Sequence, residues 1–385
     1  MLGKKSIVTV FILIPYATIS SACTGIYCAD EDVTFAACNL DWADPVARIW
    51  FIPGQKNKHG VVYFGTDGAP AYGINEEGLL FQGFINSYVN ASKSYDRPFH
   101  EGRLFHRIMQ GCAGLDEVAD MLSRYNLKEL ERAKLFFGDI NGNSMIAEGD
   151  NIVMKQGSYQ ICRAMLTQSQ PTKPRYQYVF YKNAEAMLKG KKVSKDLLRQ
   201  ALKRTCENSY NRTVCSSIFD LRSGSVSLYY YQNFDDAYTF NIAEELKKGR
   251  RTIEVINLFP DNKRANEYRH SLSQKMEAWK ATRRVVDIDT SVYSGYVGKY
   301  RAYIGNVPWT ISITTEHGKL YYSTSEFGKG ELSATSIQTF FMVSHDGIWD
   351  VEFTDSGIVT KSKNYCYMAK RLKAKPVESA NQSLE

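Results

Sequence analysis

Hydrophobic and polar positions alternate with a period of two along much of the first 260 residues, which is typical of half-buried β-strands. Turn residues separate these alternating runs. The strands that we expect span residues 24–27, 33–37, 51–53, 61–64, 135–140, 144–148, 152–154, 159–166, 214–221 and 226–231. The dipeptide Asn141-Gly142 favours a tight two-residue turn, so it predicts the clearest hairpin, between the runs 135–140 and 144–148.

Helical spacing interrupts the strands in a few places. Between residues 99 and 124, apolar side chains recur every three or four positions, and Gly111 and Gly114 predict a break into two helices. Further helical segments are expected at about 183–189 and 194–205, and a basic amphipathic helix at about 264–284. The many Lys and Arg residues of that last helix are most simply a solvated face on a connector between two domains.

After residue 285 the pattern becomes a series of short alternating segments, punctuated by Gly, Asp, His and Ser roughly every eight to twelve residues. The expected strands span residues 296–300, 309–314, 320–323, 330–333, 339–343, 348–353, 358–361 and 366–371. This spacing predicts a separate antiparallel β-barrel domain or small sandwich over residues 289–373. The polar residues 374–385 are expected to form a disordered tail.

The first residues have the pattern of an export signal. Lys4 and Lys5 precede an apolar run over residues 7–14, and Ser20 and Ala22 occupy the −3 and −1 positions of a signal-peptidase site. We therefore expect residues 1–22 to be a signal peptide and the protein to be exported, either periplasmic or secreted. The remaining domain boundaries that we expect are a first domain at 23–263 and a helical connector at 264–288.

Cleavage after Ala22 would make Cys23 the first residue of the mature chain. Its α-amine, with a pKa of about 7.7–8 in model compounds, would then lie next to its thiol and act as a base. Two other interpretations stay open, namely a disulfide cysteine and the acylated cysteine of a bacterial lipoprotein. Ser20 stands where lipoprotein signals usually carry a branched apolar residue, which disfavours acylation.

Composition narrows the class of protein. A chain of 385 residues is long for one core, so two domains are the natural expectation. The 25 Tyr residues contribute to an aromatic content of 13%, which favours strands. A net charge of +7 is too mild to indicate a nucleic-acid partner, and no basic run alternates with aromatic residues. After the signal, no apolar run is long enough to span a membrane.

The cysteines and histidines give no metal signal. All eight cysteines follow the predicted signal peptide, and their even number permits disulfides, but they contain no CxxC pair and no recognised framework. The six histidines are scattered and form no HExxH motif. The sequence therefore predicts neither a metal site nor a cofactor.

Three segments together resemble the linear-amide C–N hydrolases, the group of the choloylglycine (bile salt) hydrolases and penicillin V acylases. They are CTG at 23–25 followed by NLDW at 39–42, GINEEGL at 73–79, and FGDINGNS at 137–144 followed by IAEGD at 146–150. Residues 213–221 and 229–245 also resemble the C-terminal part of one branch. The resemblance covers residues 23–258 in the family's order.

This resemblance implies an α+β architecture, the four-layer αββα fold of N-terminal nucleophile hydrolases. It also implies hydrolysis of a small N-acyl amide, of the bile-salt or penicillin V type, through a thioester. By position, Cys23 is the nucleophile and Asp41 orients the mature amino terminus. Asn86 is the oxyanion donor if the alignment shifts by one residue from Ile85. Residues 290–371 separately resemble the small β-barrel that follows serine-hydrolase domains.

The sequence departs from the family at two positions. Bile salt hydrolases carry an arginine where this chain has Cys38, and a second family asparagine aligns with Ala164, next to Arg163. One oxyanion donor is therefore missing, and loss of such a donor typically lowers turnover about 100- to 1000-fold. The alternative interpretation is a weakened or inactive relative that binds a ligand or partner.

Overall fold

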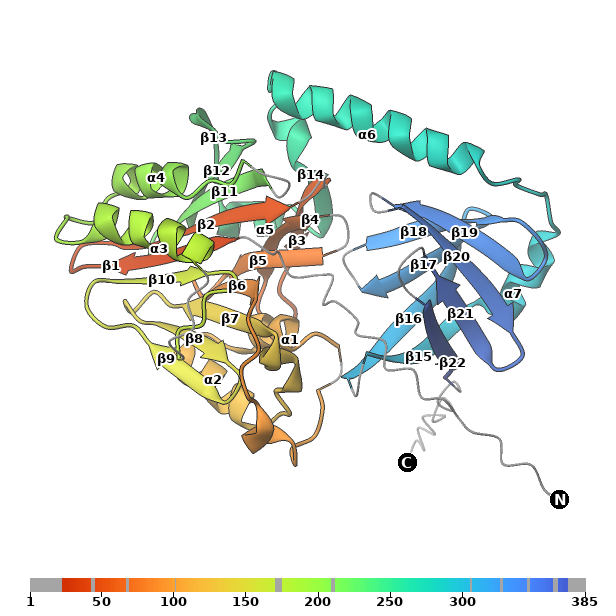
Figure 1. Cartoon of the computed structure of the whole chain (residues 1–385), viewed down its shortest axis with the longest axis horizontal. Coiled ribbons are helices and arrows are strands. Elements are labelled where there is room, and N and C mark those ends of the chain that lie inside the picture. The colour runs from red at the N-terminus through yellow and green to blue at the C-terminus, as the bar shows by residue number, and fades with distance from the viewer. Residues whose placement is uncertain are drawn as a thin grey trace, which may run out of the picture. The chain divides into compact units, whose positions relative to one another are not determined.

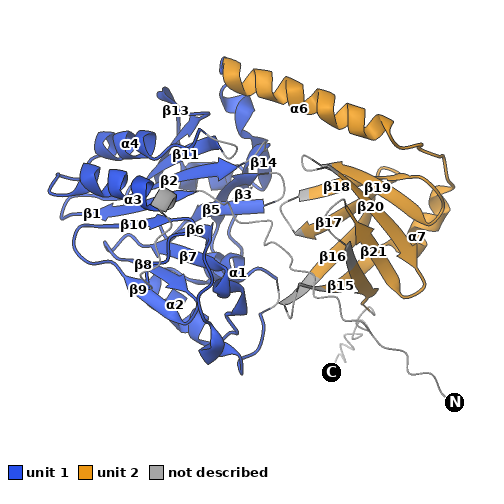
Figure 2. Cartoon of the chain, in the orientation of Figure 1, with its two compact units in different colours: residues 1–262 blue, residues 263–385 orange. Residues whose placement is uncertain are grey.

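The structure is a computed structural model that divides into two compact units, residues 1–262 and 263–385 (Figure 2). The residues that it describes are 23–42, 46–66, 69–100, 102–169, 175–208, 212–304, 307–325, 328–344, 347–362 and 366–372. The predicted signal peptide and C-terminal tail lie outside the described residues. None of the described helices has the length and apolar character needed to cross a membrane.

The first sheet of unit 1 has six antiparallel strands in the order β10-β1-β2-β11-β12-β13 (Figure 1). Strand β1 lies between β2 and β10, and Gly25 of β1 is paired with Cys38 on one side and Cys162 on the other. The strands are β1 (Thr24–Ala29), β2 (Thr34–Trp42), β10 (Tyr159–Arg163), β11 (Arg212–Asp220), β12 (Ser225–Tyr230) and β13 (Asn233–Asn241). Every residue of β1 is buried, because strands flank it and both of its faces are covered.

The second sheet has eight antiparallel strands in the order β14-β3-β4-β5-β6-β7-β8-β9. Its strands are β3 (Ala47–Ile52), β4 (Val61–Thr66), β5 (Ala69–Asn75), β6 (Leu80–Ile85), β7 (Ala133–Gly138), β8 (Ser144–Glu148), β9 (Asn151–Met154) and β14 (Arg251–Glu254). The predicted Asn141-Gly142 hairpin joins β7 to β8, and Gly142 adopts the positive φ of 88° that such a turn requires.

The two sheets stack face to face. The Tyr72 hydroxyl on β5 lies 2.9 Å from the Ser217 hydroxyl on β11, and the rings of Phe64 and Phe219 meet edge to face with centroids 5.6 Å apart. The ring of Tyr27 from β1 packs against Gly138 of β7. A side chain at residue 138 would collide with that ring, so the contact requires glycine. These contacts bury the inner face of each sheet against the other.

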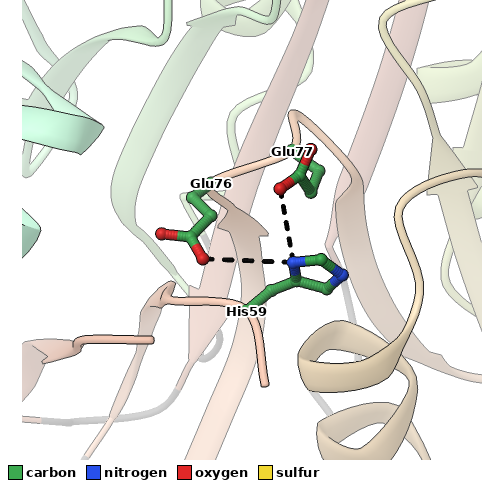
Figure 3. Close-up of side chains that lie close together, drawn as sticks. All are labelled: His59, Glu76 and Glu77. Atoms are coloured by element: carbon green, nitrogen blue, oxygen red, sulfur yellow. Dashed lines mark ion pairs between the residues drawn. The ribbon is translucent and has the colours of Figure 1, made fainter. Parts of the chain in front are cut away.

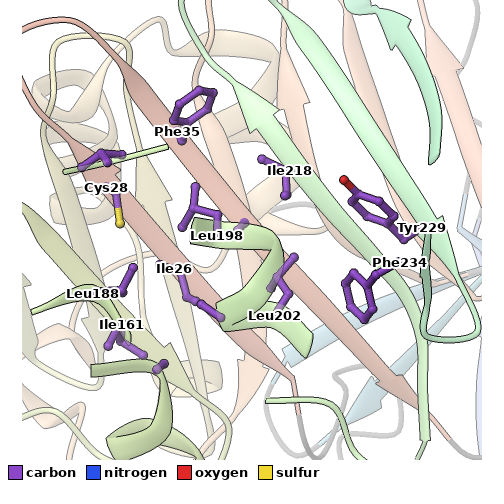
Figure 4. Packing of buried hydrophobic residues seen from close by; sticks show 14 residues of the cluster. Ile26, Cys28, Phe35, Ile161, Leu188, Leu198, Leu202, Ile218, Tyr229 and Phe234 are labelled. Carbon is purple, nitrogen blue, oxygen red and sulfur yellow. The ribbon is translucent and has the colours of Figure 1, made fainter. Parts of the chain in front are cut away.

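Two helices, α3 (Arg175–Leu188) and α4 (Lys195–Arg204), cover the outer face of the six-stranded sheet (Figure 1). Ser194 is the N-cap of α4, because its hydroxyl accepts the N–H of Leu197. The buried residues between these helices and the sheet are Ile26, Cys28, Phe35, Ala37, Ile161, Ala184, Leu188, Val193, Leu198, Ala201, Leu202, Ile218, Tyr229 and Phe234 (Figure 4).

The α1 helix (Leu104–Gly111) packs on the outer face of the other sheet, and α2 (Leu115–Ser123) follows it. The ring of Phe105 in α1 stacks on Phe81 of β6 with centroids 4.6 Å apart. The side-chain amide of Asn75 donates to the carbonyls of Met109 and Cys112, which anchors the end of α1. Helices thus cover both stacked sheets, and the four-layer αββα arrangement expected from the resemblance is confirmed.

Unit 2 contains α6 (Lys263–Ala281), the short α7 (Tyr293–Tyr296) and a closed barrel in the order β15 to β22. The strands are β15 (Gly298–Ile304), β16 (Val307–Glu316), β17 (Lys319–Ser325), β18 (Gly328–Ala334), β19 (Thr339–Ser344), β20 (Gly347–Thr354), β21 (Gly357–Lys361) and β22 (Cys366–Arg371). Pairing of Tyr300 with Arg371 closes the ring, and Tyr296 stacks on Phe353 at 4.1 Å. The predicted antiparallel barrel is confirmed.

Some elements differ from the sequence-based expectations. Strands β13 and β14 and helix α5 (Ile242–Lys247) were not expected, and α3 begins at Arg175 instead of residue 183. Strand β13 is an edge strand whose residues 235–239 are all exposed, so it lacks the alternation of a half-buried strand. The first turns of α3 contain aromatic and β-branched residues that favour strands intrinsically, and packing on the sheet overrides that preference.

We predict that Gly138→Ala lowers the free energy of unfolding by about 1–3 kcal/mol, because overpacking a closed core costs that much. A Cβ atom at residue 138 would lie 2.3 Å from Cδ2 of Tyr27. The matched control is Gly111→Ala at the end of α1, where the nearest atom would be the Met121 methyl at 3.6 Å. Denaturant unfolding measures both variants, and equal stability of the two would contradict this account of the sheet interface.

Candidate functional site

Cys23 lies immediately before β1, and both neighbouring strands hold it. Its thiol accepts the backbone N–H of Asp41 from β2 at 3.3 Å, and its carbonyl accepts the N–H of Ala164, just after β10, at 3.1 Å. Cys23 is fully buried. The structure therefore brings together two of the predicted site residues, Cys23 and Asp41, through the Asp41 backbone.

The Asp41 carboxylate belongs to a fully buried polar cluster. It accepts the Thr213 hydroxyl at 2.5 Å, and an Arg163 guanidinium nitrogen lies 3.4 Å from its second oxygen. The same guanidinium donates to the Thr24 hydroxyl and pairs with Glu207 at 2.5 Å. One cation thus serves two buried carboxylates.

Burial raises the pKa of Asp41 to about 7, although Arg163 and the Thr213 hydrogen bond act in the opposite direction and Glu207 raises it further. A carboxyl group with this pKa exchanges a proton near neutral pH, which is the range in which general acid–base groups are effective. The sequence indicated no role for Thr213 or Glu207, and Arg163 was noted only as the neighbour of Ala164. These residues come from β10, β11 and the segment before β11, so nothing in their local sequence links them.

Asn86 follows β6, and its side chain is fully buried in a different polar network. Its amide nitrogen donates to Glu148 Oε2 at 3.1 Å, and its amide oxygen accepts from Lys134 Nζ at 3.5 Å. Its described side-chain hydrogen bonds therefore go to this Lys–Glu pair and not to Cys23. The predicted oxyanion donor is positioned by charged groups that the sequence did not single out.

The Lys134–Glu148 pair also fixes the segment that follows β10. The other oxygen of Glu148 accepts the N–H of Gln168 at 2.7 Å, and Lys134 donates to the carbonyl of Leu166. Both side chains are fully buried, and burial lowers the pKa of Lys134. Because this segment begins with Ala164, the network helps to set the backbone that contacts Cys23.

The remaining described thiols are poor nucleophiles at neutral pH. Burial raises the pKa of Cys38 well above its usual value, with the neighbouring Cys23 and Cys162 adding to the effect. Burial also raises the pKa of Cys112 to about 11 and that of Cys206 to about 12. Thiols protonated at neutral pH are poor nucleophiles. The free cysteines in this set are Cys28, Cys38, Cys112, Cys162, Cys206 and Cys215.

The two departures from the family pattern are both in the core. Cys38 is fully buried on β2, with its backbone paired to Gly25. Ala164 is also fully buried, and it contributes its backbone N–H to the Cys23 carbonyl.

Comparison with known proteins finds no family model and no curated sequence that match this chain. Solved structures similar to it include two variants of conjugated bile acid hydrolase from Clostridium perfringens, with 17% and 16% identity and TM-scores of 0.45 and 0.44. Each match covers 60% of this chain, together with 96% of the first solved chain and 95% of the second. Penicillin V acylase from Agrobacterium tumefaciens has 13% identity, a TM-score of 0.36, and coverage of 60% and 90%.

The raised pKa of Asp41 predicts a pH-dependent stability. In the unfolded chain this carboxyl ionises near pH 3.9, whereas the folded chain holds the proton up to about pH 7. Native stability from this group is therefore fully present below pH 4 and is lost as the pH rises towards 7, by up to about 4 kcal/mol.

We expect Asp41→Asn to remove this dependence. The difference in unfolding free energy between the variant and the parent should shift in favour of the variant from pH 4 to pH 7 and then level off. Chemical unfolding across this range measures it, with Asp236→Asn on the exposed strand β13 as the matched control. A difference that does not change with pH would show that Asp41 ionises normally.

Proposed function

We propose that the processed chain is an exported amidohydrolase that cleaves a linear N-acyl amide, of the bile-salt or penicillin V type, with Cys23 as nucleophile. The observation that carries this proposal is the position of the Cys23 thiol, at the head of a central strand and 3.3 Å from the Asp41 backbone N–H. Cleavage after Ala22, at the site that the sequence predicts, would free an α-amine at this same place.

In this reaction the α-amine of Cys23 takes the proton of the thiol. The thiolate attacks the substrate carbonyl, and the protonated amine returns the proton to the leaving nitrogen. The products of this half are a free amine and a thioester. Water then attacks the thioester, which releases the carboxylic acid and regenerates the thiol.

Asp41 and Arg163 would set the electrostatics of the mature amino terminus. An ionised Asp41 favours a protonated amine, whereas a neutral Asp41 favours the free amine that the first step needs. Because burial raises the pKa of this carboxyl to about 7, both states are accessible near neutral pH. Arg163 holds the carboxyl in one orientation from β10.

The oxyanion is assigned to Asn86 together with backbone N–H groups. The amide nitrogen of Asn86 carries two N–H bonds, and Glu148 accepts one of them. The second is the donor that we assign to the developing negative charge. Removal of such a donor typically costs about 100- to 1000-fold in turnover, so a lone side-chain donor would make this a slow enzyme.

A second candidate function is that of a catalytically silent relative that binds a ligand or a partner. The observation that favours it is the pair of departures, Cys38 and Ala164, which remove two polar side chains of the resembling family from this region. A third possibility, an acylated Cys23 on a lipoprotein, would block the amine and exclude the mechanism above.

We predict that Cys23→Ser lowers kcat/KM by at least roughly 1000-fold, because an alcohol is a much weaker nucleophile beside a weak amine base. The assay uses penicillin V, conjugated bile salts and other N-acyl amino acids. The matched control is Cys112→Ser at the end of α1, which should keep its turnover. Unchanged hydrolysis by the Cys23 variant would eliminate the nucleophile assignment.

We also predict that intact mass spectrometry of the exported protein finds a chain that starts at an unmodified Cys23. A diacylglyceryl adduct on this residue would support the lipoprotein interpretation, and a chain that starts elsewhere would refute the processing step. An unmodified Cys23 in a protein that hydrolyses none of the amides would favour the silent relative.

A further inference from the structure

Three potential metal ligands from two separate segments meet at one end of the eight-stranded sheet (Figure 3). His59 precedes β4, whereas Glu76 and Glu77 form the turn between β5 and β6. The imidazole Nδ1 lies 3.3 Å from an oxygen of Glu77 and 3.9 Å from an oxygen of Glu76. The cluster is half-exposed, so an ion from solution can reach it.

The His59–Glu77 separation matches that of two ligands around one small metal ion, and the His59–Glu76 separation is slightly longer. Ligand atoms about 2.0–2.2 Å from a tetrahedral zinc ion lie roughly 3.3–3.5 Å from one another. The ligand atoms of the three side chains all lie within 4.8 Å of one another. Small side-chain movements would therefore place all three atoms at bonding distance from a shared ion.

The backbone of both segments is fixed before any ion binds. The His59 N–H donates to the carbonyl of Gln110 at 2.8 Å, and the Glu76 N–H donates to the carbonyl of Gly60 at 2.9 Å. The side chain of Asn75 accepts the N–H of Glu77 at 3.1 Å. Little backbone entropy therefore remains to be lost when the ligands close around an ion, and the main cost is the ordering of the side chains.

Two glycines leave room for the carboxylate of Glu76. A Cβ atom on Gly54 would lie 2.9 Å from one of its oxygens, and a Cβ atom on Gly60 would lie 3.0 Å from the other. The Gly60 N–H donates to the same carboxylate at 2.8 Å. The carboxylate is therefore oriented by the backbone of the opposite segment, as supporting groups orient metal ligands.

We propose that His59, Glu76 and Glu77 bind a divalent transition-metal ion, best represented by Zn²⁺, with water completing its coordination. One imidazole and two carboxylates suit zinc, whereas Ca²⁺ and Mg²⁺ prefer sites made entirely of oxygen. The ion would tie the residue before β4 to the β5–β6 turn and so stabilise this end of the sheet. The site is outside the predicted catalytic residues, and no sequence motif indicates it, because His59 lies 17 residues before the nearer of the two glutamates.

The test measures Zn²⁺ binding by titration calorimetry on the full processed chain without a tag, and the thermal unfolding midpoint with and without Zn²⁺. We expect one ion per chain at this site and a higher midpoint in its presence. His59→Ala and Glu77→Gln should each weaken binding at least about tenfold and abolish the rise. The described contacts of the Glu77 carboxylate are confined to His59, so this variant leaves the fold intact.

The matched controls are His270→Ala on the exposed face of α6 and Glu244→Gln in α5, which should bind Zn²⁺ as the parent does. Equal Zn²⁺ affinity in the parent and in Glu77→Gln would overturn the proposal. So would a parent chain that binds no Zn²⁺ at millimolar concentration, because the three side chains would then be neighbours at the surface and nothing more.

Discussion

A buried guanidinium group governs the geometry around the head of β1. Arg163 is fully buried, Glu207 pairs with its guanidinium group, and Asp41 does so when it is ionised. Phe180 of α3 covers the guanidinium carbon at 4.4 Å from the ring centroid. Removing one partner of such a cluster typically costs about 3–5 kcal/mol, because a charge is left unpaired in the core. Side-chain contacts of Arg163 therefore connect β10, β2 and α3, in addition to the backbone ladder that joins β10 and β2 through β1.

The thiol and the carboxylate of the proposed site occupy different environments, and the alternation of side chains along a strand explains why. Successive residues of a strand point to opposite faces of a sheet. Gly25 faces the eight-stranded sheet, as its contact with Gln82 shows, whereas Thr24 faces the helices and meets Arg163. Asp41 therefore touches the Cys23 thiol with its backbone while its carboxyl group remains in the Arg163 cluster. Strand alternation alone divides the two chemical functions between the two faces.

The local pattern of hydrophobic and polar residues was sufficient to predict most strands of the fold. Alternation predicted the barrel strands, and the Asn141-Gly142 turn predicted the β7–β8 hairpin, because both depend on neighbours close in the chain. Strand β13 escaped prediction because an exposed edge strand shows no alternation. The start of α3 escaped because its intrinsic preference opposes the packing that determines it.

The site was predictable only in part, for a related reason. Cys23 stands out because of the peptidase pattern before it, and Asp41 because a hairpin returns it to the head of β1. Thr213 contacts Asp41 directly and Glu207 is linked to it through Arg163. Both arrangements depend on the tertiary fold, so no sequence spacing predicts them. Asn86 likewise has side-chain partners from a different hairpin, because Lys134 lies on β7 and Glu148 on β8.

The other described thiols, five of them buried and Cys206 partly buried, have a consequence for how the molecule matures. If the chain is exported to an oxidising compartment, each of these thiols is open to pairing until folding buries it. Collapse of the αββα core must then outpace thiol oxidation, since a premature cross-link between β1 and β2 would trap the stack unassembled. Burial protects the thiols of the native state from oxidation. In the newly made chain, the thiols stay reduced only if folding is fast or another protein keeps them reduced.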